Sequence, residues 1–401
     1  MAKNSVIKGQ TAQVIVVGGG PAGLTAAIAL AGAGIETALI AKPPARPDTR
    51  TTALLASSVT ALDTLGVWGR CREHAAPLRV MRIIDDTGRL VRAPEVKFDC
   101  SEIGLDAFGQ NIENRHLVAA LEARAGELPS LLRIEDEAEA VTTGDDAASV
   151  SLKSGNSIAA PLIIGADGRR SLCRQAAKIE MDEHDYPQSA LALSFSHTRA
   201  HSNISTEFHT ASGPFTLVPL RGNRSSLVWV LDPATSEEIS ALDDMALSME
   251  IERRSHSILG KIAVEGSRGL FPLHIATAQT FGQNRIALIG EAAHVMPPIG
   301  AQGLNLGLRD AATIGELVAE GGGVPEMLAR YDDLRRKDIK PRTLAIDLLN
   351  RSLLSDFLPV QGARGLGLYL LDRIGPLRRA VMREGVAPAA SQPRLMRGEA
   401  L

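Results

Sequence analysis

The sequence predicts an α/β fold built on a parallel sheet, with an interposed antiparallel sheet and a helical C-terminal region. Three observations support this prediction. Apolar runs at residues 14–17, 162–164 and 285–289 each lead into a glycine-containing turn, as buried parallel strands do. Between residues 189 and 231, apolar residues mostly alternate with polar ones, which is typical of antiparallel strands. Helical spacing then returns toward the C-terminus.

The first glycine-containing turn has the spacing Gly18-x-Gly20-x-x-Gly23, and a helix of small and apolar residues opens at Pro21 and Ala22. In a dinucleotide-binding unit the first glycine allows a tight turn, the second lets the backbone approach a pyrophosphate, and the third lets the helix pack on the strand. N–H groups at the helix start then face the phosphates. A glycine-rich turn also arises for steric reasons alone, but the strand before it and the helix after it favour dinucleotide binding.

The region after the second predicted strand, residues 36–40, departs from this pattern. A carboxylate that binds the ribose is expected about twenty residues after the glycines, yet Ala41 and Lys42 occupy these positions. The next residues, 43–54, contain three prolines and are predicted to form a loop. Arg50 in this loop could supply a fixed positive charge to a phosphate or a flavin, or could be an ordinary solvated arginine, and both interpretations stay open.

Length and composition limit the class of protein. A chain of 401 residues is expected to hold two interleaved domains, and its formal net charge of −3 argues against nucleic acid as the main partner. The three cysteines lie far apart without a C-x-x-C pair, which indicates a reducing compartment and no disulfide framework. We expect a cytoplasmic protein that is at most peripheral to a membrane, because the sequence has neither an apolar secretory signal nor an apolar stretch of membrane-spanning length.

Two further glycine-containing turns follow the other apolar runs. The second, residues 165–174, contains an acid and two glycines, and basic residues come after them. The third, residues 290–310, contains two adjacent prolines that exclude a continuous helix, and a long helix is predicted from Gly303 onward. A nicotinamide dehydrogenase needs only the first turn, whereas three turns spread over almost three hundred residues fit a longer cofactor, FAD.

The remaining segments are assigned from their periodicity. Residues 78–84 and 90–98 are predicted to form a hairpin and residues 114–125 an amphipathic helix. Residues 141–158 are predicted to form a small antiparallel meander, and helical spacing is expected within 236–259.

In this order the three turns resemble the motifs of single-component flavoprotein aromatic hydroxylases, the class A flavoprotein monooxygenases, and especially those of the ubiquinone-biosynthesis hydroxylases. The resemblance runs from about residue 14 to residue 310 and into the following helix. It implies a Rossmann-like FAD-binding domain of the glutathione-reductase type, an antiparallel-sheet substrate domain and a C-terminal helical region. The predicted boundaries are 12–75, 105–180 and 275–345 for the FAD-binding domain, 76–104 and 181–274 for the substrate domain, and 346–401 for the helical region.

The resemblance also implies which residues contact the cofactors. The second turn matches a segment that serves both FAD and the nicotinamide donor in the family. In the third turn, Glu291 stands where the family usually has an aspartate that holds the FAD ribitol or ribose. The family sequence A-G-Q-G appears here as Gly300-Ala301-Gln302-Gly303, so Ala301 stands where the family has a glycine. The predicted cofactor contacts are Gly18, Gly20, Pro21, Ala22, Gly23, Arg50, Asn114, Asp167, Gly168, Ser171, Arg174, Gly290, Glu291, Pro298, Gly300, Ala301, Gln302, Gly303, Leu304 and Asn305.

The implied reaction is hydroxylation of an aromatic ring. NADPH or NADH would reduce FAD, O2 would add, and a flavin hydroperoxide would transfer a hydroxyl to a polyprenylated phenol of ubiquinone biosynthesis. The helix opening at Gly303 and Leu304 would stabilise the anionic reduced flavin. No catalytic acid or base is identified: His294 is a candidate, although a hydrogen-bonded structural histidine is favoured. His197 and His201 lack a third ligand, so no metal site is predicted.

The C-terminal tail is basic and amphipathic. Residues 330–401 carry fourteen lysines and arginines against eight acids, with apolar residues at helical spacing between them. Such helices rest on an anionic membrane or a partner such as another ubiquinone-pathway protein, or they pack on the body of the protein. Three functions stay open: a hydroxylase of a polyprenylated phenol, an FAD enzyme acting on another small aromatic substrate, and a non-catalytic flavin-binding scaffold.

Overall fold

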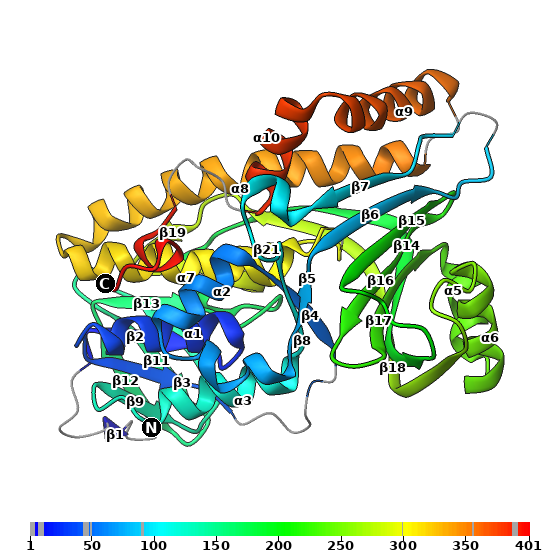
Figure 1. Ribbon diagram of the computed structural model, residues 1–401. Helices are drawn as coiled ribbons and strands as arrows, with labels where there is room; N and C mark the ends of the chain where they lie inside the picture. The colour runs from blue at the N-terminus through cyan, green and yellow to red at the C-terminus, as the bar shows by residue number, and fades with distance from the viewer. Residues whose placement is uncertain are drawn as a thin grey trace.

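A parallel sheet forms the centre of the fold (Figure 1). The structure, a computed structural model, describes residues 5–6, 12–42, 48, 50–89, 92–298, 300–354, 357–386 and 392–401. The three predicted apolar runs lie side by side in this sheet, since Ile163 pairs with Ile15 on one side and with Ile286 on the other. Five strands are parallel and β19 is antiparallel. The strand order is β19 (Gly282–Gln283), β20 (Ile286–Leu288), β13 (Leu162–Gly165), β2 (Val14–Val17), β3 (Thr37–Ile40) and β9 (Leu131–Ile134).

Helix α1 (Pro21–Gly32) packs against α3 (Asn114–Ala125) and α7 (Gln302–Glu320). Every residue of α1 from Gly23 to Ala31 is buried, because its small and apolar side chains fit between the sheet and the other helices. Two glycines of α7 permit the close approach: a Cβ atom at Gly307 would lie 3.3 Å from the Cβ of Ala22, and one at Gly315 would lie 3.4 Å from the Cβ of Ala29.

A second sheet of four strands contacts β2 and β13. Three of its strands form the predicted antiparallel meander, and the fourth strand, β1, pairs in parallel with β12. Helix α4 (Leu172–Ala177) follows β13 and lies against β10. The strands of this sheet, in order, are β1 (Ser5–Val6), β12 (Asn156–Ala160), β11 (Ala148–Leu152) and β10 (Ala138–Thr143).

The interposed sheet has eight strands and confirms the prediction of a mostly antiparallel arrangement, with one parallel pair, β15 with β6. One face carries a second apolar core that includes Phe195, Phe215 and Trp229, and helices α5 (Pro233–Ala241) and α6 (Asp244–Arg254) supply further residues to it. The order is β21 (His294–Val295), β18 (Ile262–Ala278), β14 (Met181–His197), β17 (Arg224–Leu231), β16 (Gly213–Leu220), β15 (Ile204–Thr210), β6 (Val80–Asp85) and β7 (Val96–Asp99).

Strands β14 and β18 form a long ribbon that connects the two large sheets. Each has 17 residues, and they pair from Met181 with Ala278 to His197 with Ile262. The register shifts twice along the ribbon, between Asp185 and Ser189 and again between residues 192 and 194.

The predicted C-terminal helices are present. Helix α8 (Val324–Leu354) runs along the molecule, and α9 (Leu358–Arg373) and α10 (Gly375–Val386) lie beyond it at the top of Figure 1. Helix α10 buries Met382 and Val386 against β7 and the residues around it. A last short 3-10 helix, η5 (Arg394–Arg397), packs on α2 (Ala56–Thr64) and α7.

Some local predictions were wrong. The predicted loop 43–54 contains part of a strand, β4 (Thr51–Leu55), because these residues pair with β8 (Gly109–Glu113), which also pairs with β5 (Ala76–Leu78). Residues 43–47 and 49 of that loop lie outside the described residues. Of the second strand of the predicted hairpin, 90–98, residues 90 and 91 lie outside the described residues, and in the described remainder the strand begins only at Val96 (Val96–Asp99), since Pro94 has no N–H to donate to a ladder. The domain boundaries given above stay a prediction.

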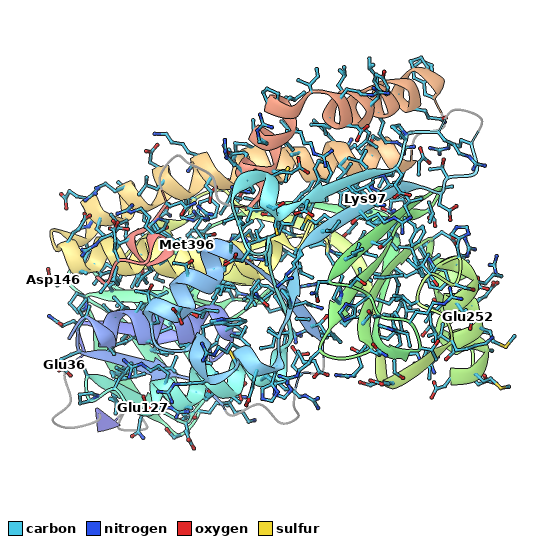
Figure 2. The ribbon with its side chains drawn as sticks, in the orientation of Figure 1. Glu36, Lys97, Glu127, Asp146, Glu252 and Met396 are labelled. Carbon is cyan, nitrogen blue, oxygen red and sulfur yellow. The ribbon has the colours of Figure 1, made fainter. Side chains whose placement is uncertain are left out.

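Charged side chains cover the outer surface of these layers. Figure 2 shows Glu36, Lys97, Glu127 and Asp146 at the periphery, and all four are exposed. The interface between α7 and α8 is different, because it buries several charged groups in the interior.

Candidate functional site

The three glycine-containing turns meet in space. A Cβ atom at Gly18, where φ is +118°, would lie 2.2 Å from the carbonyl oxygen of Ala166, so the first turn touches the second. A Cβ atom at Gly290 would lie 3.2 Å from the Cβ of Ala22, so the third turn touches the first. Segments separated by almost three hundred residues therefore line one site.

The first turn presents free backbone donors next to open space. Helix α1 has Gly20 at its N-cap and Pro21 at its first position, with no side-chain cap and no acid in its first turn. Among the described residues beyond its chain neighbours, no atom lies within 4 Å of a Cβ placed at Gly20, whereas one at Gly23 would lie 2.1 Å from the Gly18 oxygen. Uncapped N–H groups beside free space suit a pyrophosphate, which is the role predicted for Gly20.

The start of α7 has the same character. Ala301 forms the N-cap at φ +54° without a side-chain cap, and in the part of the chain that the structure describes a Cβ atom at Gly303 would meet no atom within 4 Å. Asn305 ties this helix to β4: its Nδ2 donates to the Ala53 oxygen (2.8 Å), and its Oδ1 accepts from the N–H of Leu55 (2.8 Å). The remaining predicted residues of this segment are Pro298, which is exposed, Gly300 at φ +67°, Gln302 and Leu304.

The predicted residues of the second turn hold its shape. The Ser171 hydroxyl donates to Asp167 Oδ1 (2.6 Å) and accepts from the Arg174 N–H (2.9 Å), which caps α4. Arg174 also donates from Nη1 to the carbonyl oxygen of Ala292 (3.0 Å), so it joins the second turn to the third. Gly168 adopts φ +78°, which favours glycine.

Arg50 is held in place at the edge of the site. Its Nε and Nη2 donate to Asp48 at 2.9 and 2.7 Å, and Asn114 Nδ2 donates to the same carboxylate (2.9 Å). Burial would raise the pKa of Asp48, but these hydrogen bonds outweigh it and lower the pKa. The guanidinium also lies over the Phe271 ring, 5.8 Å from its centroid. These contacts fix the position of the guanidinium, although 57% of the side chain is exposed, and its role toward a phosphate or a flavin stays a prediction.

Glu291, the substituted acid of the third turn, is exposed and faces Arg169 of the second turn. Their Oε2 and Nε atoms are 3.4 Å apart. Its charge also raises the pKa of Arg50, after the larger effect of the Asp48 hydrogen bond, so the carboxylate lies near both arginines. A carboxylate at this edge, reached from two turns, fits the hydroxyl groups of a ribitol or ribose.

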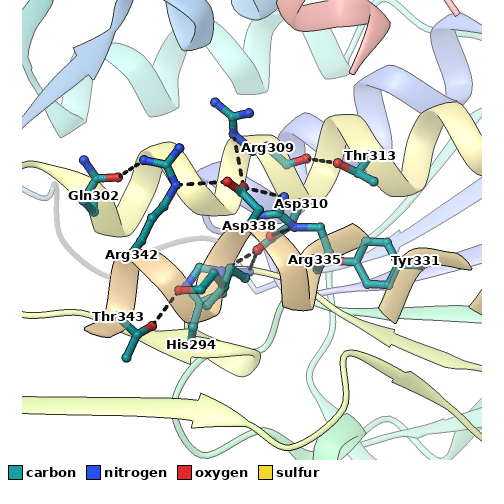
Figure 3. Close-up of polar contacts among 12 residues, drawn as sticks. His294, Gln302, Arg309, Asp310, Thr313, Tyr331, Arg335, Asp338, Arg342 and Thr343 are labelled. Atoms are coloured by element: carbon teal, nitrogen blue, oxygen red, sulfur yellow. Dashed lines mark hydrogen bonds and ion pairs between the residues drawn. The ribbon is translucent and has the colours of Figure 1, made fainter. Parts of the chain in front are cut away.

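The buried carboxylate of Asp310 holds the third turn in place through a hydrogen bond from its backbone (Figure 3). Asp310 on α7 accepts from the N–H of Gly290 (2.9 Å), from His294 Nε2 (2.6 Å) and from Arg335 Nε on α8 (2.7 Å). Burial would raise the pKa of Asp310, but the charges of His294 and Arg335 and these hydrogen bonds keep it below its ordinary value. Asp310 therefore connects the turn to two helices.

His294 lies inside this network. Its side chain is fully buried, and its Nδ1 has no hydrogen-bond partner among the described residues. The hydrogen bond to Asp310 supports the structural role that the sequence favoured over proton transfer. Neither Asp310 nor Arg335 was predicted from the sequence to be important, although two adjacent charges, Arg309 and Asp310, interrupt the mostly small and apolar residues 306–315 of α7.

A second carboxylate, the partly exposed Asp338, extends the network. It accepts from Arg335 Nη1 (2.8 Å) and from Arg342 Nε (3.0 Å). Burial would raise the pKa of Asp338, but these arginines, together with Arg309, lower it from 3.8 to about 2.

This shift predicts a loss of stability in acid. A depressed pKa stabilises the folded state above the unfolded pKa of 3.8, and the stabilisation is lost as pH falls from there toward 2. For Asp338 it amounts to about 2 kcal/mol. Urea unfolding at pH 6 and pH 3 should give a difference between the wild type and Asp338→Asn that at pH 3 is only about half of its value at pH 6. An equal difference at both values would contradict the assignment.

Comparison with known proteins identifies the family. The model of the FAD-binding domain family matches residues 11–342. The chain belongs to this family. It is 35% identical to "Ubiquinone hydroxylase UbiL" of Rhodospirillum rubrum, covering 97% of this chain and 93% of that protein. It is 30% identical to "3-demethoxyubiquinol 3-hydroxylase" of Escherichia coli, covering 93% and 98%.

Solved structures agree with the fold. The p-nitrophenol 4-monooxygenase PnpA of Pseudomonas putida has a TM-score of 0.78 at 21% identity, covering 95% of this chain and 99% of that one. HpxO of Klebsiella pneumoniae, complexed with FAD and uric acid, has a TM-score of 0.76 at 17% identity, covering 94% and 97%. The fold class predicted from the sequence is thus confirmed, and so is the resemblance to flavoprotein monooxygenases.

The residues present fit the FAD of this family. Two uncapped helix N-termini, of α1 and α7, flank turns whose glycines leave open space at Gly20 and Gly303. Between them, Asp167, Glu291 and Arg50 offer polar side chains on the second turn, the third turn and the segment before β4. The cofactor is therefore FAD, and the contacts of individual residues stay a prediction.

Proposed function

We propose that the protein is an FAD-dependent monooxygenase that hydroxylates the aromatic ring of a polyprenylated phenol in ubiquinone biosynthesis. Similarity over nearly the whole chain to the two ubiquinone hydroxylases carries this proposal. The convergence of the three turns supports it, because it provides one site for an extended cofactor. When bound, FAD supplies the chemistry that passes electrons from NADPH or NADH to O2.

The residues of the chain would then orient the cofactor and exclude water. The N–H groups at the start of α7 favour negative charge near Gly303. Met296, next to the two prolines of the third turn, packs against an apolar cluster that includes Val230 of β17 and Leu273 of β18. This apolar contact would border the substrate and limit the access of water to the reacting centre.

Each turnover consumes one O2, one NAD(P)H and one proton. It yields one hydroxylated ring, one NAD(P)+ and one water. The test is NADPH and NADH oxidation by the purified yellow protein, with and without a short-chain prenylated phenol. We expect the phenol to accelerate oxidation at least about tenfold and mass spectrometry to find one added oxygen atom. Bound flavin without phenol-dependent oxidation would instead indicate the non-catalytic scaffold, and oxidation stimulated only by other phenols would indicate another substrate.

We further propose that α8 to α10 contact an anionic membrane surface. Nine of the exposed large apolar side chains lie on this part of the chain: Leu344, Leu348, Leu349, Phe357, Leu366, Tyr369, Ile374, Leu377 and Val381. The basic excess of residues 330–401 would complement anionic lipid. Among the described residues, no helix has the length and hydropathy needed to cross a bilayer. Contact at the surface would bring the site near a lipid-resident substrate.

The membrane proposal predicts a selective effect of one apolar residue. Leu366→Asp, at a side chain 57% exposed on α9, should reduce flotation with phosphatidylglycerol vesicles at low salt several-fold, because it removes apolar area and adds negative charge. Met245→Asp, at a side chain 73% exposed on α6, should leave flotation unchanged. A wild type that does not float, or two variants that float equally, would count against the proposal, and a stable protein complex lost with Leu366→Asp would indicate a protein partner.

A further inference from the structure

A small cavity lies where α2, α7, α8 and α10 meet. Ser57 and Ser58 of α2, Gln302 and Arg309 of α7, and Arg342 of α8 line it. The volume open to a water-sized sphere is about 10 Å³, close to the space that one water molecule needs. Polar and apolar groups both line the cavity, and two of the polar groups are guanidiniums.

One of these guanidiniums is short of partners. The side chain of Arg309 is only 7% exposed, and its nearest ion-pair contact is Nε to Asp338 Oδ2 at 3.5 Å. Figure 3 shows its two terminal nitrogens pointing away from Asp338. In the described part of the chain these Nη atoms have no hydrogen-bond partner, and they are not among the fully buried polar atoms, so water or an ion can reach them.

The surrounding charges do not balance. Three guanidiniums, those of Arg309, Arg335 and Arg342, share two carboxylates, Asp310 and Asp338. Burial, together with the repulsion from Arg335 and Arg342, outweighs the attraction of Asp338 and lowers the pKa of Arg309 to about 10. One positive charge is therefore left over beside the cavity, and an anion there would offset the cost of burying it.

The N-terminus of α2 faces the same cavity. Its N-cap residue, Leu55, provides no side-chain cap, and its first turn contains no acid. Ser57 and Ser58 occupy the second and third positions, where the N–H groups have no partner within the helix. The positive end of this helix dipole adds to the charge of Arg309.

We propose that this cavity binds one small inorganic anion, a halide such as chloride, between Arg309 and the N-terminus of α2. A tetrahedral oxyanion would be too large for a space that holds about one water. The proposed anion site lies apart from the place where α7 contacts the first and third turns. Gly307 makes that contact, and Arg309 lies two residues further on, roughly on the opposite side of the helix.

Thermal unfolding of the FAD-saturated protein tests the proposal. At constant ionic strength, replacement of gluconate by 0.3 M chloride should raise the unfolding midpoint by about 2 °C, as expected if the anion is in about tenfold excess over its dissociation constant. Arg309→Met removes the unbalanced charge and should lose this response. Arg330→Met, which removes an exposed arginine of α8 paired with Glu320, should keep it.

A crystal of the wild type grown in bromide gives a second, independent measurement. The anomalous difference map should contain a peak in the cavity beside Arg309. Equal unfolding midpoints in chloride and gluconate, a chloride response that persists in Arg309→Met, or a cavity without anomalous signal would each overturn the proposal. If Arg309→Met does not fold, the bromide crystal of the wild type decides. None of these outcomes depends on the hydroxylase activity, so failure here leaves the proposed function untouched.

Discussion

Gly20→Ala should give a folded protein that binds FAD roughly 100-fold more weakly, a loss of about 2.7 kcal/mol. The backbone at Gly20 is extended, with φ −73° and ψ 170°, which alanine adopts without strain. The added methyl group meets no protein atom, since none lies within 4 Å. It projects instead into the space predicted for the pyrophosphate. Fluorescence titration of the apoprotein with FAD measures the effect, and circular dichroism confirms folding.

The matched control is Gly32→Ala at the other end of α1. A Cβ atom there also meets nothing within 4 Å, but it is distant in sequence from the turn. This variant should bind FAD like the wild type. Equal affinity of the Gly20 and Gly32 variants would mean that the pyrophosphate does not approach the first turn. Gly18→Ala should instead destabilise the fold itself, because its Cβ atom would overlap the backbone of Ala166.

Asp310→Asn should destabilise the protein by about 3–5 kcal/mol, because it removes the fully buried carboxylate that pairs with Arg335 and leaves that cation only its second partner, Asp338. The amide keeps the size of the side chain, so the loss reports charge and hydrogen bonding rather than a cavity. The hydrogen bonds of Gly290 and His294 to the carboxylate would weaken as well, so the third turn should hold FAD less tightly. Urea unfolding and FAD release on dilution measure the two effects.

Asp333→Asn is the control, because it makes the same substitution on α8 at an exposed ion pair with Lys337. It should cost at most about 0.5 kcal/mol. A similar small cost for Asp310→Asn would mean that the network contributes little to folding. Normal stability with weakened FAD binding would instead limit its role to the third turn.

Local pattern was sufficient for much of the fold. The strand at residues 14–17 and the helix at 114–125 match β2 and α3 residue for residue, because each carries its own periodicity and boundary residues. Strand β18 was missed, since Gly266, Gly269 and Pro272 interrupt its pattern. It is defined by pairing with β14, which is a property of the tertiary structure and not of its own sequence.

The site was predictable where glycine spacing encodes backbone geometry, as in the three turns. The network behind it was not. Asp310 and Arg335 lie 25 residues apart on two helices, and in sequence each resembles a solvated charge on a helix surface. Only the packing of α8 on α7 makes them buried partners. The pairing of Arg50 with Asp48 was missed for a related reason, because the loop around them gave no periodic signal.

The ribbon of β14 and β18 limits how the molecule can move. A flexible linker would let the substrate sheet swing freely away from the nucleotide-binding layers, whereas two paired strands resist both stretching and shear. Bending is least costly where pairing is already irregular, at the shifts between Asp185 and Ser189 and between residues 192 and 194. The second shift lies where β14 also pairs with β17, so opening of the molecule to admit a large substrate would be a hinge between Asp185 and Ser189, with the substrate sheet tilting as one rigid unit.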